Sequence, residues 1–237
     1  MKNTAFLPKN ACFTEGVMFE KIDVLLRPIH FLIFNFLIHL MRIIAGKFKG
    51  RRFYPPADNW PTRPTTDFAK EGLFNILNNT FDFEEIKVLD LFGGTGNHTY
   101  EFISRGCLDV TYVDKHAPAV KFVRETAKKL EIEDNLRIIQ GDVFKFVAAA
   151  YEQFDYIFAG PPYGLAGLDS IPDKVFGKKL LRGDGWFVLE HNPNHNFKAH
   201  PNFYQVRNYG KTIFSIFMNI EAMAELNENA DEAELAD

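Results

Sequence analysis

The chain has 237 residues, of which 46% are hydrophobic and 24% are charged, and its formal net charge is -4. This is an ordinary composition for a soluble globular protein, and the length is sufficient for one domain with a full hydrophobic core and short appendages. The two cysteines, Cys12 and Cys107, are far apart and have no metal-ligand spacing. We therefore expect neither a disulfide framework nor a zinc or other metal site, and a reducing cytoplasm as the setting.

The first forty residues differ in character from the rest of the chain. Residues 29–40, IHFLIFNFLIHL, are mostly apolar but too short to span a bilayer as a helix, and no small-residue cleavage site follows them. Met41 then opens a segment of a different kind, MRIIAGKFKGRRF. We expect Met41 to be the true start, residues 1–40 to be an upstream extension and the protein to have no membrane partner. The alternative is an interfacial or partner-binding helix.

Charge is distributed unevenly along the chain. Residues 221–237 hold seven acidic residues and no basic one, which predicts a disordered acidic tail. Residues 42–63 are basic, with the single acid Asp58 against Arg42, Lys47, Lys49, Arg51, Arg52 and Arg63. Such an excess can neutralise phosphates. The alternative is a solvated basic surface with no partner.

Strand and helix patterns alternate from Met41 onward. Residues 41–60 predict a β-hairpin, with a Gly/Lys turn between two strands and two prolines at its end. A helix is expected from about Thr66, because Thr65 and Thr66 precede a periodic apolar set. Further helices are expected over 98–104 and 118–132, and strands over 86–92, 109–114, 136–142, 154–164, 185–191 and 209–220. Because the strands are apolar rather than alternating, residues 61–220 predict an α/β fold with a doubly wound, mostly parallel sheet.

Acidic residues and glycines follow three successive predicted strands. The first strand runs into Asp90-Leu91-Phe92-Gly93-Gly94-Thr95-Gly96, where glycines allow the backbone to approach a ligand closely. Asp114 ends the second strand, where an acid can bind ribose hydroxyls, and Asp142 ends the third, placed to accept from an adenine amine. In a doubly wound sheet these strand ends meet at the ligand site. The set therefore predicts a nucleotide-like ligand.

The glycine turn also distinguishes between two cofactors. Dinucleotide folds use GxGxxG to seat a pyrophosphate, whereas this chain has Asp90 before the turn and Thr99 at the third glycine position. A carboxylate there would repel phosphate and suit a cationic ligand. S-adenosylmethionine thus fits better than a dinucleotide.

The fourth strand runs into a rigid corner, FAGPPYG, at residues 158–164. Pro161 and Pro162 fix the backbone, the carbonyls around Pro161 can accept from an exocyclic amine, and Tyr163 can stack on a flat base. Gly160, Pro161, Pro162 and Tyr163 are therefore the predicted catalytic corner, beside the methyl donor. Glu190 is taken simply to end the fifth strand, and His191 and His195 to be loop histidines.

Four segments together resemble one family. MRIIAGKFKGRRF, RPTTDFAKEGLFNIL, VLDLFGGTGNHTYEFISRGC and FDYIFAGPPYGL, in this order and spacing, are similar to the bacterial 16S ribosomal RNA guanine-N2 methyltransferases that modify guanine 966. The resemblance covers about residues 41–220. It implies a class I methyltransferase fold, S-adenosylmethionine as donor, and 16S rRNA or the small ribosomal subunit particle as partner, and we expect a cytoplasmic monomer. By position, Asp90, Gly93, Gly94 and Gly96 would line the methionine side of the donor, Asp114 the ribose and Asp142 the adenine, and Arg63, Thr65 and Thr66 would belong to an RNA-facing loop. Phe92, within the glycine segment, is also predicted to bind the donor, and Lys47, Lys49, Arg51 and Arg52 are predicted to bind RNA because of their charge.

One position departs from the family pattern. Such enzymes usually carry Asp, Asn or Ser before Pro-Pro-Tyr, as an acceptor for the target amine, and this chain has Gly160. A missing contact of this kind costs on the order of 2 to 4 kcal/mol of transition-state stabilisation. A non-catalytic or impaired RNA-binding homologue is therefore one alternative to an rRNA guanine-N2 methyltransferase. A DNA base-amine methyltransferase is the other, since Pro-Pro-Tyr corners occur there too.

Overall fold

The computed structural model describes residues 41–56 and 65–221. The predicted extension at 1–40, Arg63 and all but the first residue of the acidic tail lie outside the described residues. Among the described helices, none is both long and apolar enough to cross a membrane.

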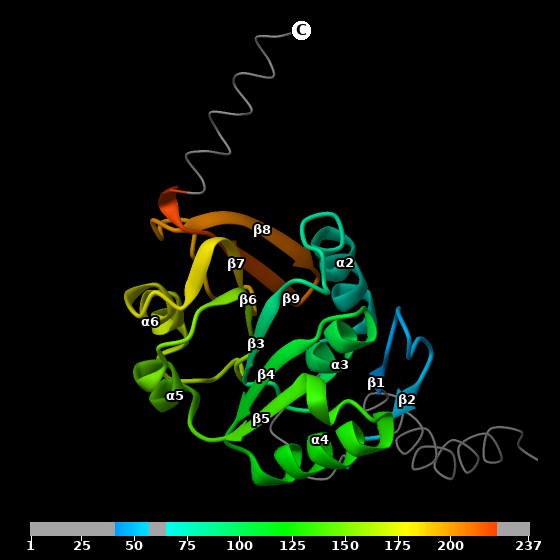
Figure 1. Cartoon of the computed structure of the whole chain (residues 1–237). Coiled ribbons are helices and arrows are strands. Elements are labelled where there is room, and N and C mark those ends of the chain that lie inside the picture. The colour runs from blue at the N-terminus through cyan, green and yellow to red at the C-terminus, as the bar shows by residue number, and fades with distance from the viewer. Residues whose placement is uncertain (1–40, 57–64, 222–237) are drawn as a thin grey trace, which may run out of the picture. The chain divides into compact units, whose positions relative to one another are not determined.

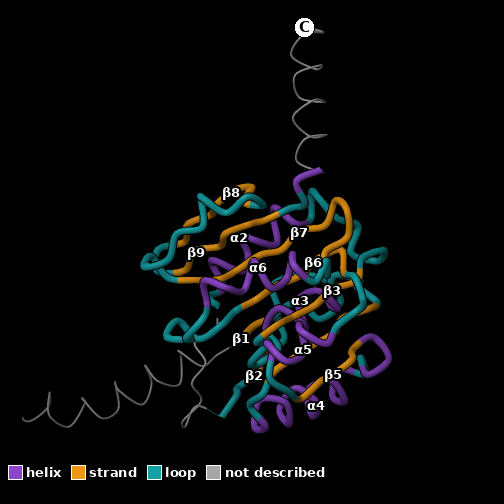
Figure 2. The backbone as a smooth tube through the Cα atoms, turned by 90° about the vertical axis from the view of Figure 1, so that its left-hand side faces the viewer, coloured by secondary structure: helices purple, strands orange, loops and turns teal. Residues whose placement is uncertain are grey.

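The described chain forms a seven-stranded sheet in the order β5-β4-β3-β6-β7-β9-β8 (Figures 1 and 2). Strands β3 to β7 are parallel to one another, whereas β9 runs antiparallel to both β7 and β8. Their bounds are β3 Lys87–Leu91, β4 Asp109–Asp114, β5 Leu136–Gln140, β6 Phe154–Ala159, β7 Leu181–His191, β8 Phe203–Tyr209 and β9 Thr212–Phe217. The prediction of a doubly wound, mostly parallel sheet is confirmed. Strand β8 was not predicted.

Helices cover both faces of the sheet (Figure 1). One face carries α2 (Asp67–Leu77), α3 (Asn97–Ser104) and α4 (Ala117–Leu130); the other carries α5 (Val143–Ala149) and α6 (Ile171–Gly177). Two short 3-10 turns, η1 (Glu133–Asn135) and η2 (Leu168–Ser170), precede β5 and α6. Helix α2 begins where predicted, because the Thr66 hydroxyl accepts a hydrogen bond from the Ala69 amide and caps the helix.

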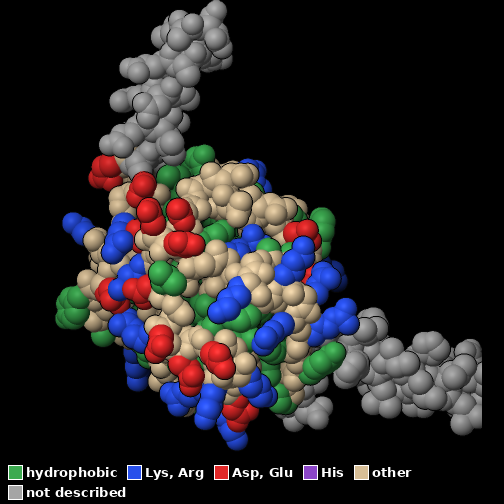
Figure 3. Space-filling model, turned by 45° about the vertical axis from the view of Figure 1, so that its right-hand side comes forward, with side chains coloured by type: hydrophobic (Ala, Val, Ile, Leu, Met, Phe, Trp, Pro, Cys, Tyr) green, Lys and Arg blue, Asp and Glu red, His purple; other side chains and the backbone are tan. Residues whose placement is uncertain are grey.

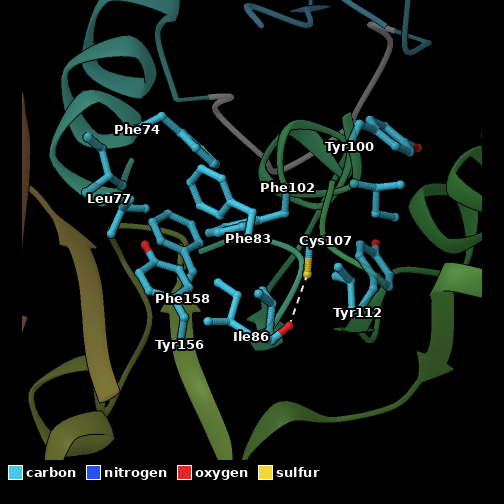
Figure 4. Packing of buried hydrophobic residues seen from close by; sticks show 14 of the residues in the cluster. Phe74, Leu77, Phe83, Ile86, Tyr100, Phe102, Cys107, Tyr112, Tyr156 and Phe158 are labelled. Atoms are coloured by element: carbon cyan, nitrogen blue, oxygen red, sulfur yellow. Dashed lines mark hydrogen bonds between the residues drawn. The ribbon is translucent and has the colours of Figure 1, made fainter. Parts of the chain in front are cut away.

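Alternate side chains along the central strands enter two separate cores, as the period of a strand requires. In β6, Tyr156 and Phe158 pack on the α2 and α3 side, whereas Ile157 and Ala159 pack on the α5 and α6 side. Figure 4 shows the first core, where Phe74 of α2 and Phe102 of α3 meet with ring centroids 4.7 Å apart. Cys107 is buried at the edge of this cluster, and its thiol donates to the Ile86 carbonyl at 3.3 Å.

The predicted N-terminal hairpin is present, with only two paired residues on each side. Strand β1 (Met41–Arg42) pairs antiparallel with β2 (Arg52–Phe53). The hairpin is fastened to α3, because the Glu101 carboxylate accepts from the amides of Ile44 and Ala45 at 2.8 and 3.0 Å. These hydrogen bonds hold the hairpin against α3.

Candidate active site

A cavity of about 590 Å³ opens at the carboxyl ends of β3, β4, β6 and β7. Ligands of doubly wound sheets bind at this edge, where the strand order reverses. Here the reversal lies between β3 and β6, which are neighbours in the sheet although β4 and β5 separate them in sequence. The wall of the cavity includes Gly93 and Gly94 of the glycine turn, the corner from Gly160 to Tyr163, and the side chains of Asp90, Asp114, Thr65, His98 and Glu190.

The glycine turn is shaped by the aromatic ring beneath it. A Cβ atom at Gly93 would lie 2.4 Å from the Tyr112 ring, so no larger residue fits without moving that buried ring. The Tyr112 hydroxyl also donates to the Gly94 carbonyl at 2.7 Å. Gly96 has φ = 78° and caps α3 in the left-handed conformation that glycine adopts without strain. Predicted residues Phe92, Gly93 and Gly94 all line the cavity, whereas Gly96 shapes the turn behind it.

Asp90 is a buried carboxyl at the floor of the cavity. Its Oδ2 accepts from the amide and the hydroxyl of Thr99 at 3.2 and 2.6 Å. Its Oδ1 is buried with no hydrogen-bond partner among the described residues. Burial raises the pKa of Asp90 to about 7, and the nearby Asp114 carboxylate adds to this rise against the hydrogen bonds from Thr99. A cationic group arriving in the cavity would favour the ionised form.

The other two predicted acids have different positions. Asp114 is buried in the cavity wall, where Oδ2 accepts from the Gly94 amide at 2.9 Å and Oδ1 from the His116 amide at 2.7 Å. Asp142 does not belong to the cavity lining; its Oδ1 accepts from the Lys145 amide at 3.0 Å and caps α5. Contact of Asp142 with an adenine stays a prediction.

The predicted corner lies beside the glycine turn. The Gly160 amide donates to the Leu91 carbonyl at 3.2 Å, which joins the end of β6 to the end of β3. Gly160, Pro161, Pro162 and Tyr163 all line the cavity. A Cβ atom at Gly160 would lie 3.1 Å from Cε1 of Phe158 and so would require a small shift of that ring.

Glu190 and His98, which the sequence interpretation left out of the site, lie in the same cavity wall. Glu190 is only 5% exposed; its Oε2 accepts from the Thr65 hydroxyl at 2.5 Å and its Oε1 from the Tyr163 hydroxyl at 3.2 Å. The Thr65 oxygen also lies 3.2 Å from His98 Nε2. Since the one hydroxyl proton of Thr65 goes to Glu190, His98 must donate from Nε2. Burial lowers the pKa of His98 well below its usual value, so the imidazole is neutral.

A signal for Glu190 was present in the sequence. It ends a strand in the same way as Asp114, and the rule that strand ends meet at the ligand site applies to it equally. His191 lies outside the cavity lining, with its ring nitrogens 2.8 Å from Ser215 Oγ and the Asn192 carbonyl. His195 is paired with Asp169. Neither histidine belongs to the site.

The predicted RNA-facing residues divide into three groups. Lys47, Lys49, Arg51 and Arg52 are exposed on the hairpin. Thr65 is buried in the cavity wall and Thr66 caps α2, while Arg63 lies outside the described residues. Lys and Arg side chains are numerous on the face that Figure 3 brings forward, with acidic side chains among them. Contact of these residues with RNA stays a prediction.

The residues of the cavity fit S-adenosylmethionine. The donor carries an ammonium group and a sulfonium, and the unpartnered Oδ1 of Asp90 offers a buried anionic acceptor for a cation. Asp114 stands at the end of the neighbouring strand, where two carboxylate oxygens can accept further bonds from ribose hydroxyls. The backbone of Gly93 and Gly94 lies between them in the cavity wall. Fold and site together define a class I S-adenosylmethionine-dependent methyltransferase.

Comparison with known proteins gives the family. The chain belongs to the family described as "Conserved hypothetical protein 95", whose model matches residues 41–218. Ribosomal RNA small subunit methyltransferase D of Buchnera aphidicola is 28% identical over 187 residues, which are 76% of this chain and 92% of that protein.

Two solved structures share the fold. A hypothetical protein of Thermus thermophilus matches with a TM-score of 0.67 at 24% identity, over 76% of this chain and 99% of that one. The T. thermophilus 16S rRNA N2 G1207 methyltransferase, solved with AdoMet and guanosine, matches with a TM-score of 0.54 at 21% identity, over 67% of this chain and 44% of that one.

Proposed function

We propose that this protein methylates the exocyclic N2 amine of a guanine in 16S ribosomal RNA, with S-adenosylmethionine as donor. The observation that carries the proposal is the single cavity that joins the donor-side residues Asp90, Gly93 and Asp114 to the Pro-Pro-Tyr corner. A relative named as a small-subunit rRNA methyltransferase supports the choice of RNA. The substrate is this RNA or the small-subunit particle, handled in the cytoplasm by a monomer.

Each part of the cavity has a separate task in this proposal. The donor supplies a methyl group bound to a positively charged sulfur. Asp90 binds cationic charge and Asp114 binds hydroxyl groups, which together hold the donor against the glycine turn. The ring of Tyr163 supports the guanine by stacking, and the Pro161 carbonyl accepts from its amine. Holding both reactants in one orientation contributes a large share of the rate.

The exposed cations of the hairpin contact the RNA phosphates. Lys47, Lys49, Arg51 and Arg52 lie on an element fastened to α3, whose first residues line the cavity. Phosphate contacts set the register and orientation of a nucleic acid, whereas contacts to base edges give specificity. The hairpin therefore positions the RNA, and the cavity selects the base.

The proposal is tested by methyl transfer to small-subunit particles purified from cells that lack the modification. Labelled S-adenosylmethionine and mass spectrometry of the digested nucleosides would identify the product. We expect N2-methylguanosine at one site in 16S rRNA, and no transfer by the Asp114→Ala variant at donor concentrations that saturate the parent protein.

Two other outcomes would replace the proposal. Binding of particles and donor without transfer would favour the non-catalytic RNA-binding homologue, which the glycine at 160 makes a specific alternative. Transfer to adenine or cytosine of DNA, with none to particles, would favour a DNA base-amine methyltransferase.

A further inference from the structure

Gly160 has no side chain to accept a hydrogen bond from the target amine, but an acidic residue, Glu190, lies next to it on the neighbouring strand. In the parallel pairing of β6 with β7, Phe158 lies opposite Val188 and Ala159 opposite Leu189. Gly160 directly follows the end of β6 at Ala159, and continuing this register by one residue places it opposite Glu190 as the next pair. Neighbouring strands are about 4.8 Å apart, so the Cα atoms of this pair are close together.

The two positions also face the same side of the sheet. Phe158 and Val188 both pack in the core on the α2 and α3 side, and side chains two residues apart on a strand share a face. Any side chain at position 160 and the side chain of Glu190 would thus point to the same side. Both positions line the same cavity.

The Glu190 carboxylate is held in place by side chains of two other segments. Thr65 donates to Oε2 at 2.5 Å, and the Tyr163 hydroxyl donates to Oε1 at 3.2 Å. Thr65 is in turn oriented by His98, whose ring stacks on Phe158 with centroids 3.6 Å apart. This chain of contacts orients a carboxylate at the corner that also presents Tyr163 to a base.

We propose that Glu190 is the acceptor for the target amine in this protein and takes over, from the neighbouring strand, the task for which position 160 has no side chain. The inference rests on the proposed function, because it requires an amine-bearing base at the corner. A carboxylate can accept about four hydrogen bonds, so binding the amine is compatible with the bonds from Thr65 and Tyr163.

The proton balance of the step is simple. The amine nitrogen uses its lone pair to form the new bond to the methyl carbon, while the electron pair of the broken carbon–sulfur bond stays on sulfur. The nitrogen, now positively charged, loses one proton to a Glu190 oxygen, and the product amine is neutral. Glu190 then releases this proton to solvent through the open cavity. An acceptor of this kind contributes most as positive charge develops on nitrogen.

A binding experiment tests the inference without any methyl transfer. Guanosine and inosine differ only by the N2 amine, and their affinities can be compared by calorimetry on protein saturated with S-adenosylhomocysteine. We expect the parent to bind guanosine at least 10-fold more tightly than inosine, and Glu190→Ala to lose most of this preference, because only the Pro161 carbonyl then remains to accept from the amine. Equal binding of the two nucleosides by the parent, or no binding of guanosine, would overturn the inference even if the protein methylates RNA.

A kinetic experiment separates a catalytic role of Glu190 from a structural one. In single-turnover methylation of small-subunit particles, Glu190→Gln should lower the rate about 100- to 1,000-fold, as for other single polar contacts made in the transition state. Adding Gly160→Asp to this variant should raise its single-turnover rate at least 10-fold. In the parent background Gly160→Asp should change the rate less than 10-fold, because the acceptor is already present.

A matched control removes a carboxylate from the same strand. Asp184 is exposed near the other end of β7, and Asp184→Asn should leave the rate unchanged. If Glu190→Gln is slow and Gly160→Asp gives no rescue, Glu190 supports the fold of the corner and the inference is wrong. A parent inactive on particles but able to discriminate guanosine from inosine would refute the proposed function and leave the acceptor assignment supported.

Discussion

Asp90 gives a sharp test of the electrostatics of the cavity, because the free-energy cost of burying its carboxyl group depends on pH. The carboxyl is 1% exposed, and burial raises its pKa from 3.8 to about 7. For a carboxyl with a raised folded-state pKa, the contribution to stability is fully present below pH 3.8 and is lost as the pH rises through about 7. The ligand-free protein should therefore be less stable at pH 8 than at pH 5 on account of this one group.

The magnitude follows from the size of the shift. Each pKa unit corresponds to about 1.4 kcal/mol, so the part of the shift titrated between pH 5 and pH 8 corresponds to about 2 to 3 kcal/mol. Asp90→Asn removes the titration while its Oδ1 can still accept from Thr99. The amide Nδ2 would be buried without a partner at a cost of about 1 to 3 kcal/mol, but this cost is the same at both pH values.

The measurement is urea unfolding of parent and Asp90→Asn, both free of donor, at several pH values between 5 and 8. We expect the free energy of unfolding of the variant, minus that of the parent, to rise by about 2 to 3 kcal/mol over this range. Asp184→Asn, which removes an exposed carboxylate, should show no such rise. A difference between Asp90→Asn and parent that stays constant with pH would refute the argument, because it would mean that Asp90 is not destabilised by ionisation.

Three further predictions concern the donor, the RNA and the base. Asp114→Ala should weaken S-adenosylmethionine binding at least 10-fold in calorimetry, and unchanged affinity would remove Asp114 from the donor site. Replacing any one exposed hairpin cation by alanine should reduce the slope of log affinity for 16S rRNA against log salt concentration by about one unit or slightly less. Binding that does not depend on salt would show that these residues form a solvated surface without phosphate contacts. Tyr163→Ala should lose about 1 to 3 kcal/mol of RNA binding in a filter assay and leave donor affinity intact; equal losses of both would indicate a collapsed corner.

The sequence predicted those parts of the fold that local patterns determine. The Thr66 cap and the apolar strands produce their elements from residues close together in the chain, and each was found where expected. Strand β8 was missed because polar residues interrupt its apolar ones and no residue of it is fully buried, as is usual for an edge strand. Its pairing with β9 depends on contacts that a scan for apolar runs does not detect.

The candidate site shows a similar division. The glycine turn, Asp114 and the Pro-Pro-Tyr corner were predicted from strand ends, and the cavity contains all of them. Asp142 was predicted by the same rule, but β5 ends at Gln140 and the Asp142 carboxylate caps the helix that follows, which a strand-end rule cannot distinguish from ligand binding. Glu190 was missed although its place near the end of a strand was a usable signal. His98 was missed because its part in the site comes from contact with Thr65, which is 33 residues away in the chain.

A buried ion pair connects the N-terminal hairpin to the cavity. Lys70 of α2 is fully buried, and its ammonium donates to the Arg42 carbonyl of the hairpin and to Asn97 Oδ1, each at 2.7 Å, beside the Glu101 carboxylate at 3.2 Å. Asn97, at the start of α3, in turn donates to the Thr65 carbonyl at 3.2 Å. Burial lowers the pKa of Lys70, while Glu101 opposes this and favours the charged form.

This network fixes the geometry that the proposed function needs. Lys70, Glu101 and Asn97 join the hairpin, α3 and the cavity wall at Thr65 through one buried polar network. The position of the exposed hairpin cations relative to the Pro-Pro-Tyr corner is therefore set when the protein folds. Buried ion pairs add little net stability compared with apolar packing, but a removed partner leaves an uncompensated charge. Under the proposed function, Lys70 and Glu101 are better explained by position than by stability, because they would hold the hairpin in one orientation relative to the cavity that receives the base.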